Sequence, residues 1–372
     1  MLRLRVRSSQ AGWTLGLLTC SVLFLTAGAA LAQPVGAVFT MNNSAAGNQI
    51  MAYDRAADGT LSFAGAYPTQ GLGTGAGLGS QGALALSEGG RWLLAVNAGS
   101  NDVSVFGVIG SALVFRSTAP SGGMRPTSVT ANGNTVFVLN AGGTPNISGF
   151  HLSATGILRP LPGSTRTLNG QAPAQVSFNN GGNLLVVSNK GSNTFDVFRI
   201  EGRNIYGPFS QASNGPTPFG FSFDHRDRLL VSEAAGGAPG ASSASSYEVM
   251  NDGTLQLISG SVGTMQTAAC WIIVTKDGNY AYTANTGSST LTGFSISQDG
   301  MLTLLNSDGV TGFPGVDSKP IDLAFSVGGE FLYSLNFGNG TITGFSVADD
   351  GSLGSIGSVS GLPTSVAGLV AR

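Results

Sequence analysis

A unit of about 50 residues recurs seven times along the 372-residue chain, and this repeat constrains the fold more than any other feature. Each copy has a turn glycine followed by a short apolar strand, and successive turn glycines lie 46 to 51 residues apart. The turn glycines are Gly59, Gly110, Gly156, Gly202, Gly253, Gly300 and Gly351. A second series keeps step with the first, because each copy also contains an apolar strand with a polar residue at its end. These strand-ending residues are Asn42, Asn97, Asn140, Asn189, Glu233, Asn285 and Asn336.

Each unit offers two further strands. One alternates apolar and polar residues, as in 102–106 and 341–346, which is the pattern of a half-buried strand. The other lies upstream of the Asn strand and commonly opens with proline, as at Pro126, Pro173 and Pro320. Four short antiparallel strands per unit, glycine turns and no helical periodicity predict an all-β, seven-bladed β-propeller.

The two ends of the repeat array predict how the ring closes. The strand at 35–42 has no proline-opened strand before it, and the strand at 363–369 has no partner after it. We expect the two to complete one blade, which removes exposed strand edges. Residues 33–372 are therefore predicted to form one domain, although length alone would favour two.

The first 32 residues have the pattern of a secretory signal peptide. Three arginines precede an apolar stretch from Leu15 to Leu31, and Ala30-Leu31-Ala32 is a small-residue cleavage pattern. A retained membrane anchor is the alternative, but it needs about 20 apolar residues with firm flanks. We expect export to the periplasm or the exterior and no membrane span after cleavage.

The charge and the cysteine content limit which partners and which disulfides the chain can form. Cleavage would leave a formal charge of −5 and Cys270 as the one cysteine, so we expect no nucleic-acid partner and no intrachain disulfide. Nothing indicates a cofactor, and we expect a monomer. The two histidines lie in different blades and the carboxylates of the Asp-Gly turns are dispersed, so no metal site is predicted.

The candidate site comes from departures from the repeat on one face of the predicted ring. The Asn series itself is best explained by turn architecture. Glu233 replaces Asn in one blade, Lys190 follows Asn189, and Arg125 and Lys319 precede the prolines of two inner strands. We predict Glu233 and Arg125 as catalytic, a carboxylate polarising water and a cation holding an oxyanion. The predicted substrate-binding residues are Lys190, Lys319, Asn189 and Tyr247. The alternative is a rim of solvated, non-catalytic charges.

Two glycine-rich or small-residue segments border this face. Residues 234–246, which end at Tyr247, form either a binding loop over the face or a flexible insertion. Residues 70–79 pose the same choice, and they lack the Lys-Ser/Thr ending of a phosphate-binding loop.

The repeats resemble the seven-bladed propeller family of lactonases, which includes propeller-type 6-phosphogluconolactonases and carboxy-cis,cis-muconate cyclases. Residues 96–106 and 284–294 carry the resemblance most clearly: an Asn-ended strand, a Gly-Ser turn and a Val-Ser-Val-Phe-like strand. The resemblance implies hydrolysis or formation of a lactone of a sugar acid or a muconate. Family members carry His after the proline of inner strands, whereas this chain has Thr127, Ala174 and Phe219 there. A non-enzymatic binding or cell-surface scaffold is the competing hypothesis, and a metal- or quinone-dependent propeller is a weaker third.

Overall fold

The computed structural model describes residues 1–2, 4–12, 33–202 and 204–372, and it divides the chain into one unit at residues 1–32 and another at residues 33–372. Residues 1–2 and 4–12 contain no helix or strand. The apolar core and cleavage pattern of the predicted signal peptide lie outside the described residues. Among the residues described, no helix has the length and apolar character to cross a membrane.

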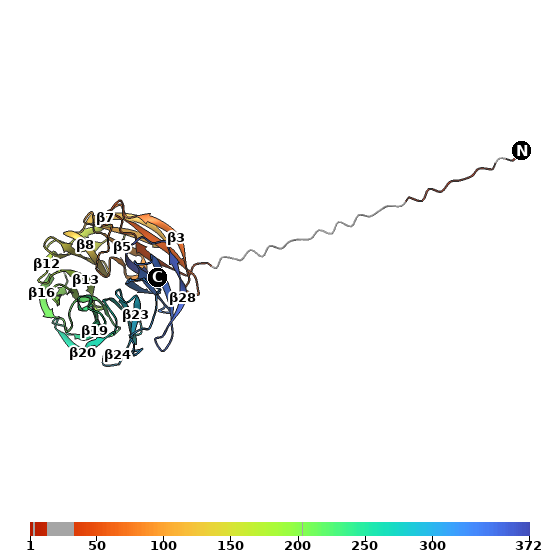
Figure 1. The fold of residues 1–372 in the computed structure, drawn as a ribbon. Coiled ribbons are helices and arrows are strands. Elements are labelled where there is room, and N and C mark those ends of the chain that lie inside the picture. Colours follow the sequence, from red (N-terminus) through yellow and green to blue (C-terminus); the bar gives the residue numbers. More distant parts are fainter. Residues whose placement is uncertain (3, 13–32, 203) are drawn as a thin grey trace. The chain divides into compact units, whose positions relative to one another are not determined.

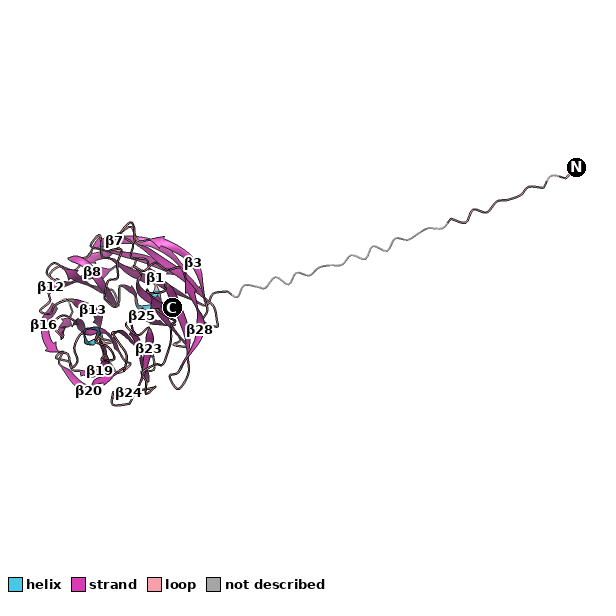
Figure 2. Ribbon diagram, viewed as in Figure 1, coloured by secondary structure: helices cyan, strands magenta, loops and turns pink. Residues whose placement is uncertain are grey.

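Residues 33–372 fold into seven sheets arranged in a ring, as the repeat predicts (Figure 1). All strand pairings within the sheets are antiparallel, and two short 3₁₀ turns, η1 (Glu88–Gly90) and η2 (Ala235–Gly237), are the helical elements of this unit (Figure 2). From the innermost strand outward, the first three blades are β29 (Ala367–Ala371), β1 (Gly36–Met41), β2 (Gln49–Arg55) and β3 (Leu61–Pro68); β4 (Leu84–Leu86), β5 (Trp92–Asn97), β6 (Asp102–Ile109) and β7 (Ala112–Pro120); and β8 (Met124–Asn132), β9 (Thr135–Gly142), β10 (Asn146–Leu152) and β11 (Leu158–Pro160) with β12 (Arg166–Thr167).

The remaining four blades keep the four-stranded order without interruption. They are β13 (Pro173–Phe178), β14 (Leu184–Asn189), β15 (Thr194–Glu201) and β16 (Asn204–Ala212); β17 (Pro218–Phe223), β18 (Leu229–Glu233), β19 (Ser243–Val249) and β20 (Leu255–Gly263); β21 (Ala269–Val274), β22 (Tyr280–Asn285), β23 (Thr290–Ile296) and β24 (Leu302–Leu304); and β25 (Pro320–Phe325), β26 (Phe331–Asn336), β27 (Thr341–Val347) and β28 (Leu353–Ser360).

The ring closes in blade 1, where the last strand pairs with the first. β29 lies antiparallel to β1, with Phe39 opposite Val370, and forms the innermost strand of that sheet. The predicted closure between the two ends of the array is therefore confirmed. Blade 3 departs from the expected pattern, because its outermost strand is split into β11 and β12, which both pair with β10.

The core consists of apolar side chains packed between neighbouring blades. The second strand of each blade is almost wholly buried, as in β5 and β14, where every residue is buried. Phenylalanines and tyrosines dominate the largest fully buried side chains, which include Phe39, Phe137 and Tyr333. This packing fixes the inner strands around the axis, and the candidate site is built at the face where those strands begin.

Candidate functional site

The face at which the inner strands begin is called the mouth below, and a recurring backbone feature shapes it. In five blades the residue just before the inner strand, or its second residue in blade 3, is non-glycine with a positive φ: Arg125 (53°), Ala172 (48°), Thr217 (60°), Ala268 (54°) and Lys319 (47°). A positive φ is uncommon outside glycine, so its repetition marks a fixed structural role. The N–H of Arg125 donates to Asn101 Oδ1 of the preceding blade, and Thr217 N–H donates likewise to Asn193 Oδ1. Arg125 and Lys319 therefore occupy equivalent, exposed positions.

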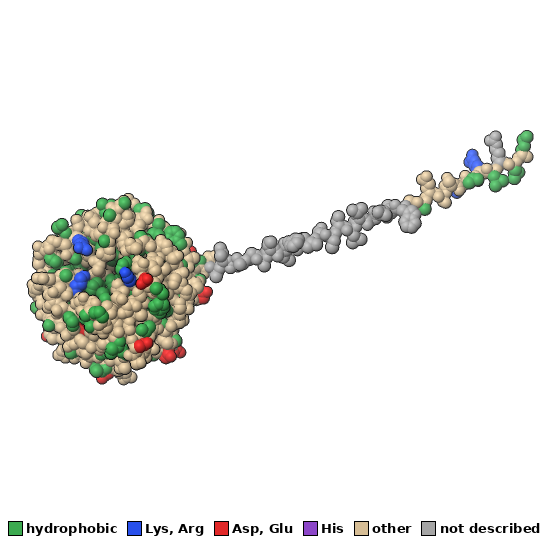
Figure 3. Space-filling view, viewed as in Figure 1, with side chains coloured by type: hydrophobic (Ala, Val, Ile, Leu, Met, Phe, Trp, Pro, Cys, Tyr) green, Lys and Arg blue, Asp and Glu red, His purple; other side chains and the backbone are tan. Residues whose placement is uncertain are grey.

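Lys190 is the cation that the structure holds most firmly at the mouth. Its Nζ donates a hydrogen bond to the carbonyl of Gly79 and lies 4.6 Å from the ring centroid of Phe219, a cation–π distance. Burial lowers the pKa of Lys190, Cys270 opposes this shift, and the positive charge of Arg125 lowers the pKa further. The coupling indicates that Arg125, Lys190 and Cys270 share one part of the mouth. The face seen in Figure 3 is hollowed at its centre, and blue Lys and Arg side chains lie near the hollow.

Lys319 belongs to another part of the rim. Its Nζ lies 6.0 Å from the ring centroid of Phe337, and its N–H donates to Ser289 Oγ. Within the described residues, no hydrogen bond or ion pair joins its side chain to Arg125 or Lys190. The structure thus brings together two of the three predicted cations.

Glu233 does not face the mouth, and here the sequence prediction was wrong. The side chain is 0 % exposed, and both of its carboxyl oxygens are occupied by hydrogen bonds. Oε1 accepts from the Gly215 N–H at 2.8 Å and from Ser245 Oγ at 2.6 Å, and Oε2 accepts from Ser243 Oγ and from Ser261 Oγ at 2.8 Å. A carboxyl group enclosed by four donors links three strands of blade 5 and has no free oxygen for a water or a substrate.

Asn189 and Tyr247 also lie inside blades. Asn189 is fully buried beside Gly170, where a Cβ would come within 2.2 Å of Asn189 Nδ2. Tyr247 is 3 % exposed, its hydroxyl accepts from the Asn214 N–H at 2.8 Å, and burial raises its pKa. Neither side chain can touch a ligand at the mouth, so the predicted binding roles of both are contradicted by their burial.

The other Asn residues of the series confirm the architectural explanation. Asn285 Nδ2 donates to Thr290 Oγ1 and Thr292 Oγ1, and Asn336 Nδ2 donates to Thr341 Oγ1 and Thr343 Oγ1 in the same arrangement. Each amide ties the second strand of its blade to the third. Glu233 serves the same purpose with serine partners, because Ser243 and Ser245 of β19 donate to it. The small-residue segment 234–246 therefore contains η2 and the first residues of β19.

The glycine-rich segment after β3 forms the floor of the mouth, which sequence reasoning did not foresee. Ser80 Oγ donates to the Thr127 carbonyl at 2.8 Å, and Trp271 Nε1 donates to the Ser80 carbonyl at 3.0 Å. Gln81 Nε2 donates to the Ile272 carbonyl at 3.0 Å, and Gln81 Oε1 accepts from the Ile272 N–H at 3.3 Å. Gln81 therefore pairs with β21 across the channel, which is the space enclosed by the inner strands around the axis of the ring. Gly220 is required beside it, because a Cβ there would lie 1.9 Å from Gln81 Oε1.

Cys270 lies beside Lys190 but is not a nucleophile at neutral pH. Burial raises the pKa of its thiol to about 12, which Thr286 and Lys190 only partly oppose. A thiol with so high a pKa stays protonated, and the thiolate is the reactive form.

A second buried titratable group lies deeper, on the inner strand of blade 7. Asp322 is 3 % exposed and accepts hydrogen bonds from the N–H groups of Leu323 (2.9 Å) and Leu369 (3.0 Å), which joins blade 7 to the closing strand β29. Burial raises its pKa to about 8. At the far end of the channel, a cavity of about 360 Å³ is lined by β21, β25 and β29 and bordered by Lys276. Among the described residues, no cluster of His, Cys, Asp and Glu could hold a metal ion.

Comparison with known proteins agrees with the fold. Residues 236–364 match the family model described as "Lactonase, 7-bladed beta-propeller". This match confirms the resemblance to the propeller lactonase family that the repeats carry. A search of curated proteins finds no match.

Solved structures cover most of the chain at low sequence identity. A putative 6-phosphogluconolactonase from Bacteroides fragilis is 17% identical, with a TM-score of 0.69, and the alignment covers 91% of this chain and 98% of that one. A protein from Lactobacillus plantarum is 17% identical with a TM-score of 0.71, over 91% and 99%. A periplasmic gluconolactonase from Pseudomonas aeruginosa is 18% identical with a TM-score of 0.65, over 89% and 98%. These likenesses show the propeller fold.

Proposed function

We propose that the chain is an exported, periplasmic or extracellular, lactonase-type propeller that hydrolyses or forms a cyclic ester of sugar-acid or muconate type at the mouth. The single observation that carries this proposal is the setting of Lys190: an ammonium of lowered pKa, seated on Phe219 and bonded to a backbone carbonyl. The Gly79 carbonyl accepts an N–H of Lys190 whether or not the amine is protonated, so this bond positions the amine while its lone pair accepts a proton. The lactonase family match supports the reaction class. Arg125 and Lys190 lie outside residues 236–364, so their assignment rests on geometry.

The chemistry assigns Lys190 two successive roles. Its neutral amine takes a proton from water as the water oxygen bonds to the ring carbonyl carbon, and the guanidinium of Arg125 stabilises the resulting oxyanion. The ring C–O bond then breaks, and the Lys190 ammonium returns the proton to the alkoxide. The product is a hydroxy acid, and the lysine ends as it began. A lowered pKa favours this cycle because it raises the fraction of neutral amine near neutral pH.

The test is proton release, followed by pH-stat, from a panel of sugar, aryl and muconate lactones. We expect Lys190→Met to lower kcat/KM by about 100-fold or more, the size of a lost general base. Lys276→Met is the matched control, since the chain has three lysines and Lys276 borders the opposite end of the channel. Equal turnover by Lys190→Met and Lys276→Met would contradict the proposal.

A second candidate function, binding without turnover, is favoured by a different observation. Ser80 and Gln81 fill the channel below Lys190, and the expected catalytic carboxyl of Glu233 is enclosed. A folded protein that turns over no lactone in the panel, yet binds the hydroxy acids in calorimetry with an affinity that Lys190→Met weakens, would establish this function instead.

A further inference from the structure

Five of the seven junctions between neighbouring blades are held by the same contact. The carbonyl of the turn glycine of one blade accepts a hydrogen bond from a side chain of the blade beside it, at 2.7 Å in every case. The donors and acceptors are Tyr333 and Gly59, Tyr282 and Gly351, Ser246 and Gly300, Gln211 and Gly253, and Ser117 and Gly156.

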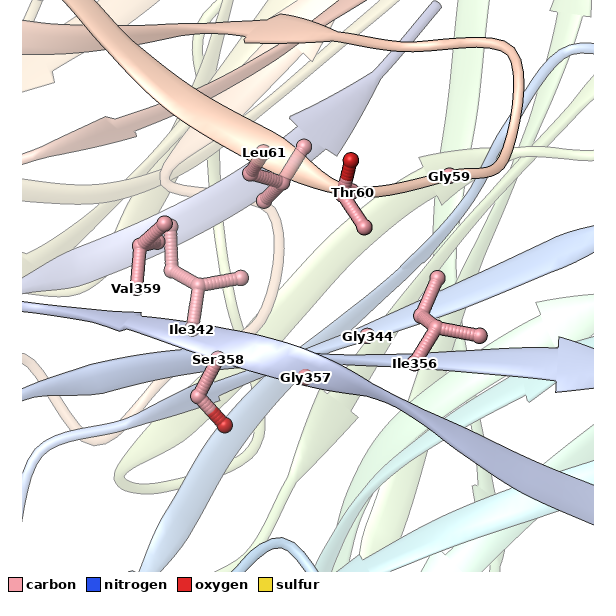
Figure 4. A pocket seen from close by; sticks show the side chains of 9 residues that line it. All are labelled: Gly59, Thr60, Leu61, Ile342, Gly344, Ile356, Gly357, Ser358 and Val359. Atoms are coloured by element: carbon pink, nitrogen blue, oxygen red, sulfur yellow. The ribbon is translucent and has the colours of Figure 1, made fainter.

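At the junction between blades 7 and 1, this contact accompanies close packing on the outer side of the ring. Gly59 packs so near Phe331 and Ile356 that a Cβ would lie 2.4 and 2.6 Å from their side chains. The crevice left there holds only about 130 Å³ and is lined by residues such as Leu61 and Ile342 (Figure 4).

The junction between blades 3 and 4 lacks this closure. Gly202, the turn glycine of blade 4, has no atom within 4 Å of a Cβ position, and within the described residues no blade 3 side chain bonds its carbonyl. Residue 203 lies outside that set. Phe137 stands three residues before the strand-ending Asn140, where Tyr282 and Tyr333 stand in their blades, and it lacks the hydroxyl that would make the contact. The outermost strand of blade 3 is also split at this place.

A cavity of about 430 Å³ opens where these three departures meet. This volume is within the range of small-molecule pockets, roughly 300 to 1,000 Å³. Its walls are apolar, with Phe137, Ile200 and Ile205, and they come from both blades. Its polar side chains are His151, Thr135 and Ser164. The Ser164 hydroxyl is already bonded to the Gly149 and Leu161 carbonyls, whereas His151 and Thr135 lie directly opposite each other on β10 and β9.

We propose that this cavity is a second ligand site, separate from the mouth, for a small aromatic or alicyclic molecule that carries a hydrogen-bond-accepting or anionic group. The ring packs against Leu161, Pro162 and Ile200, apolar residues of the cavity wall that are partly or fully exposed, because a flat hydrocarbon ring removes such surface from water. The polar group of the ligand lies at His151 and Thr135, which can donate to it. The inference is independent of the proposed lactonase activity.

The first experiment is a fluorescence titration of the full chain with 1-anilinonaphthalene-8-sulfonate, an aromatic probe with one anionic group. We expect saturable binding to one site, and Ile200→Phe, which fills the cavity, should raise Kd at least about tenfold, or about 1.4 kcal/mol. Val108→Phe is the matched control, since Val108 holds the equivalent place in β6 of blade 2 and should leave Kd within about twofold. Equal binding by both variants, or no saturable binding by the parent protein, would overturn the proposal.

The second experiment does not depend on how well Ile200→Phe folds. The chain has two histidines, so proton NMR shows two imidazole C2–H signals, which His225→Gln assigns. The probe should shift the His151 signal along its saturation curve and leave the His225 signal in place. A His151 signal that does not move while the probe binds would place the probe elsewhere and contradict the site.

Discussion

Asn189 in blade 4 and Glu233 in blade 5 hold equivalent positions, and the comparison of the two blades separates structure from candidate chemistry. Each residue is directly opposite the proline that opens its own inner strand, Pro173 and Pro218 respectively. Both side chains point into the sheet and are fully buried. Lys190, one residue further along, leaves the sheet and reaches Gly79 and Phe219. Glu233 joins its strands through four hydrogen bonds, whereas the buried amide of Asn189 has no hydrogen-bond partner among the described residues. The residue at the strand end is therefore enclosed in the blade, and the next residue serves the mouth.

The largest expected effect is on the buried side of this comparison. Glu233→Ala leaves the Gly215 N–H and three serine hydroxyls without their acceptor and opens a cavity, so we expect it to lower the free energy of unfolding by about 3–5 kcal/mol. Denaturant titration measures this loss. Lys190→Met should change the same quantity by less than about 1 kcal/mol. Similar losses in the free energy of unfolding for Glu233→Ala and Lys190→Met would contradict the distinction between the buried strand-end residue and the mouth residue after it.

The next effect concerns the pH dependence of stability that arises from Asp322, which accepts the hydrogen bond between blade 7 and the closing strand. The unfolded chain ionises Asp322 near its ordinary pKa, about 4, whereas the folded protein holds the proton up to about 8. The folded state therefore binds more protons in this interval, and the free energy of unfolding should fall with rising pH by up to about 1.4 kcal/mol per unit. Asp322→Asn removes the titrating group and with it this pH dependence. The difference in the free energy of unfolding between the parent protein and the variant should therefore change as the pH rises from 5 to 8. A difference that stays constant would contradict the assignment.

A smaller effect tests the coupling at the mouth. Arg125→Met removes the positive charge that lowers the pKa of Lys190, so that pKa should rise. The rising limb of the pH–rate profile, where Lys190 loses its proton, should move to higher pH, and kcat/KM at pH 7 should fall by about 100-fold, since the variant also loses the guanidinium that stabilises the oxyanion. Lys319→Met is the control, because Lys319 lies on another part of the rim. A rising limb of the pH–rate profile that does not shift in Arg125→Met would contradict an influence of Arg125 on the pKa of Lys190.

The smallest effect extends the comparison to a blade without unusual charges. Asn336→Ala removes the amide that bonds Thr341 and Thr343, and we expect a loss of about 1 kcal/mol in the free energy of unfolding. Asn339→Ala, at an exposed turn three residues later, should cost less than about 0.5 kcal/mol. A larger loss in the free energy of unfolding for Asn339→Ala than for Asn336→Ala would contradict a structural role for the strand-end asparagines.

The sequence predicted the ring, the seven blades and the closing pair because these depend on local patterns that repeat. Glu233 was misassigned because its partners lie 10, 12 and 28 residues later, at Ser243, Ser245 and Ser261, beyond any repeat that a strand pattern defines. The floor of the mouth was not predicted for the same reason, since Gln81 bonds Ile272, which is 191 residues away in the sequence. Arg125 and Lys190 could be picked out from the sequence because charges are rare at these repeat positions: Lys319 is the counterpart of Arg125 in blade 7, and the residues equivalent to Lys190 in the other blades are uncharged.

The closure of blade 1 also has a consequence for how the protein is made. β1 (Gly36–Met41) leaves the ribosome long before β29 (Ala367–Ala371), and its inner edge stays unpaired until β29 emerges. At roughly 5–20 residues per second, that edge waits for tens of seconds. An unpaired strand edge is a template for association with other chains. The order of synthesis thus leaves the nascent chain most exposed to association at the very strand whose pairing later closes the ring.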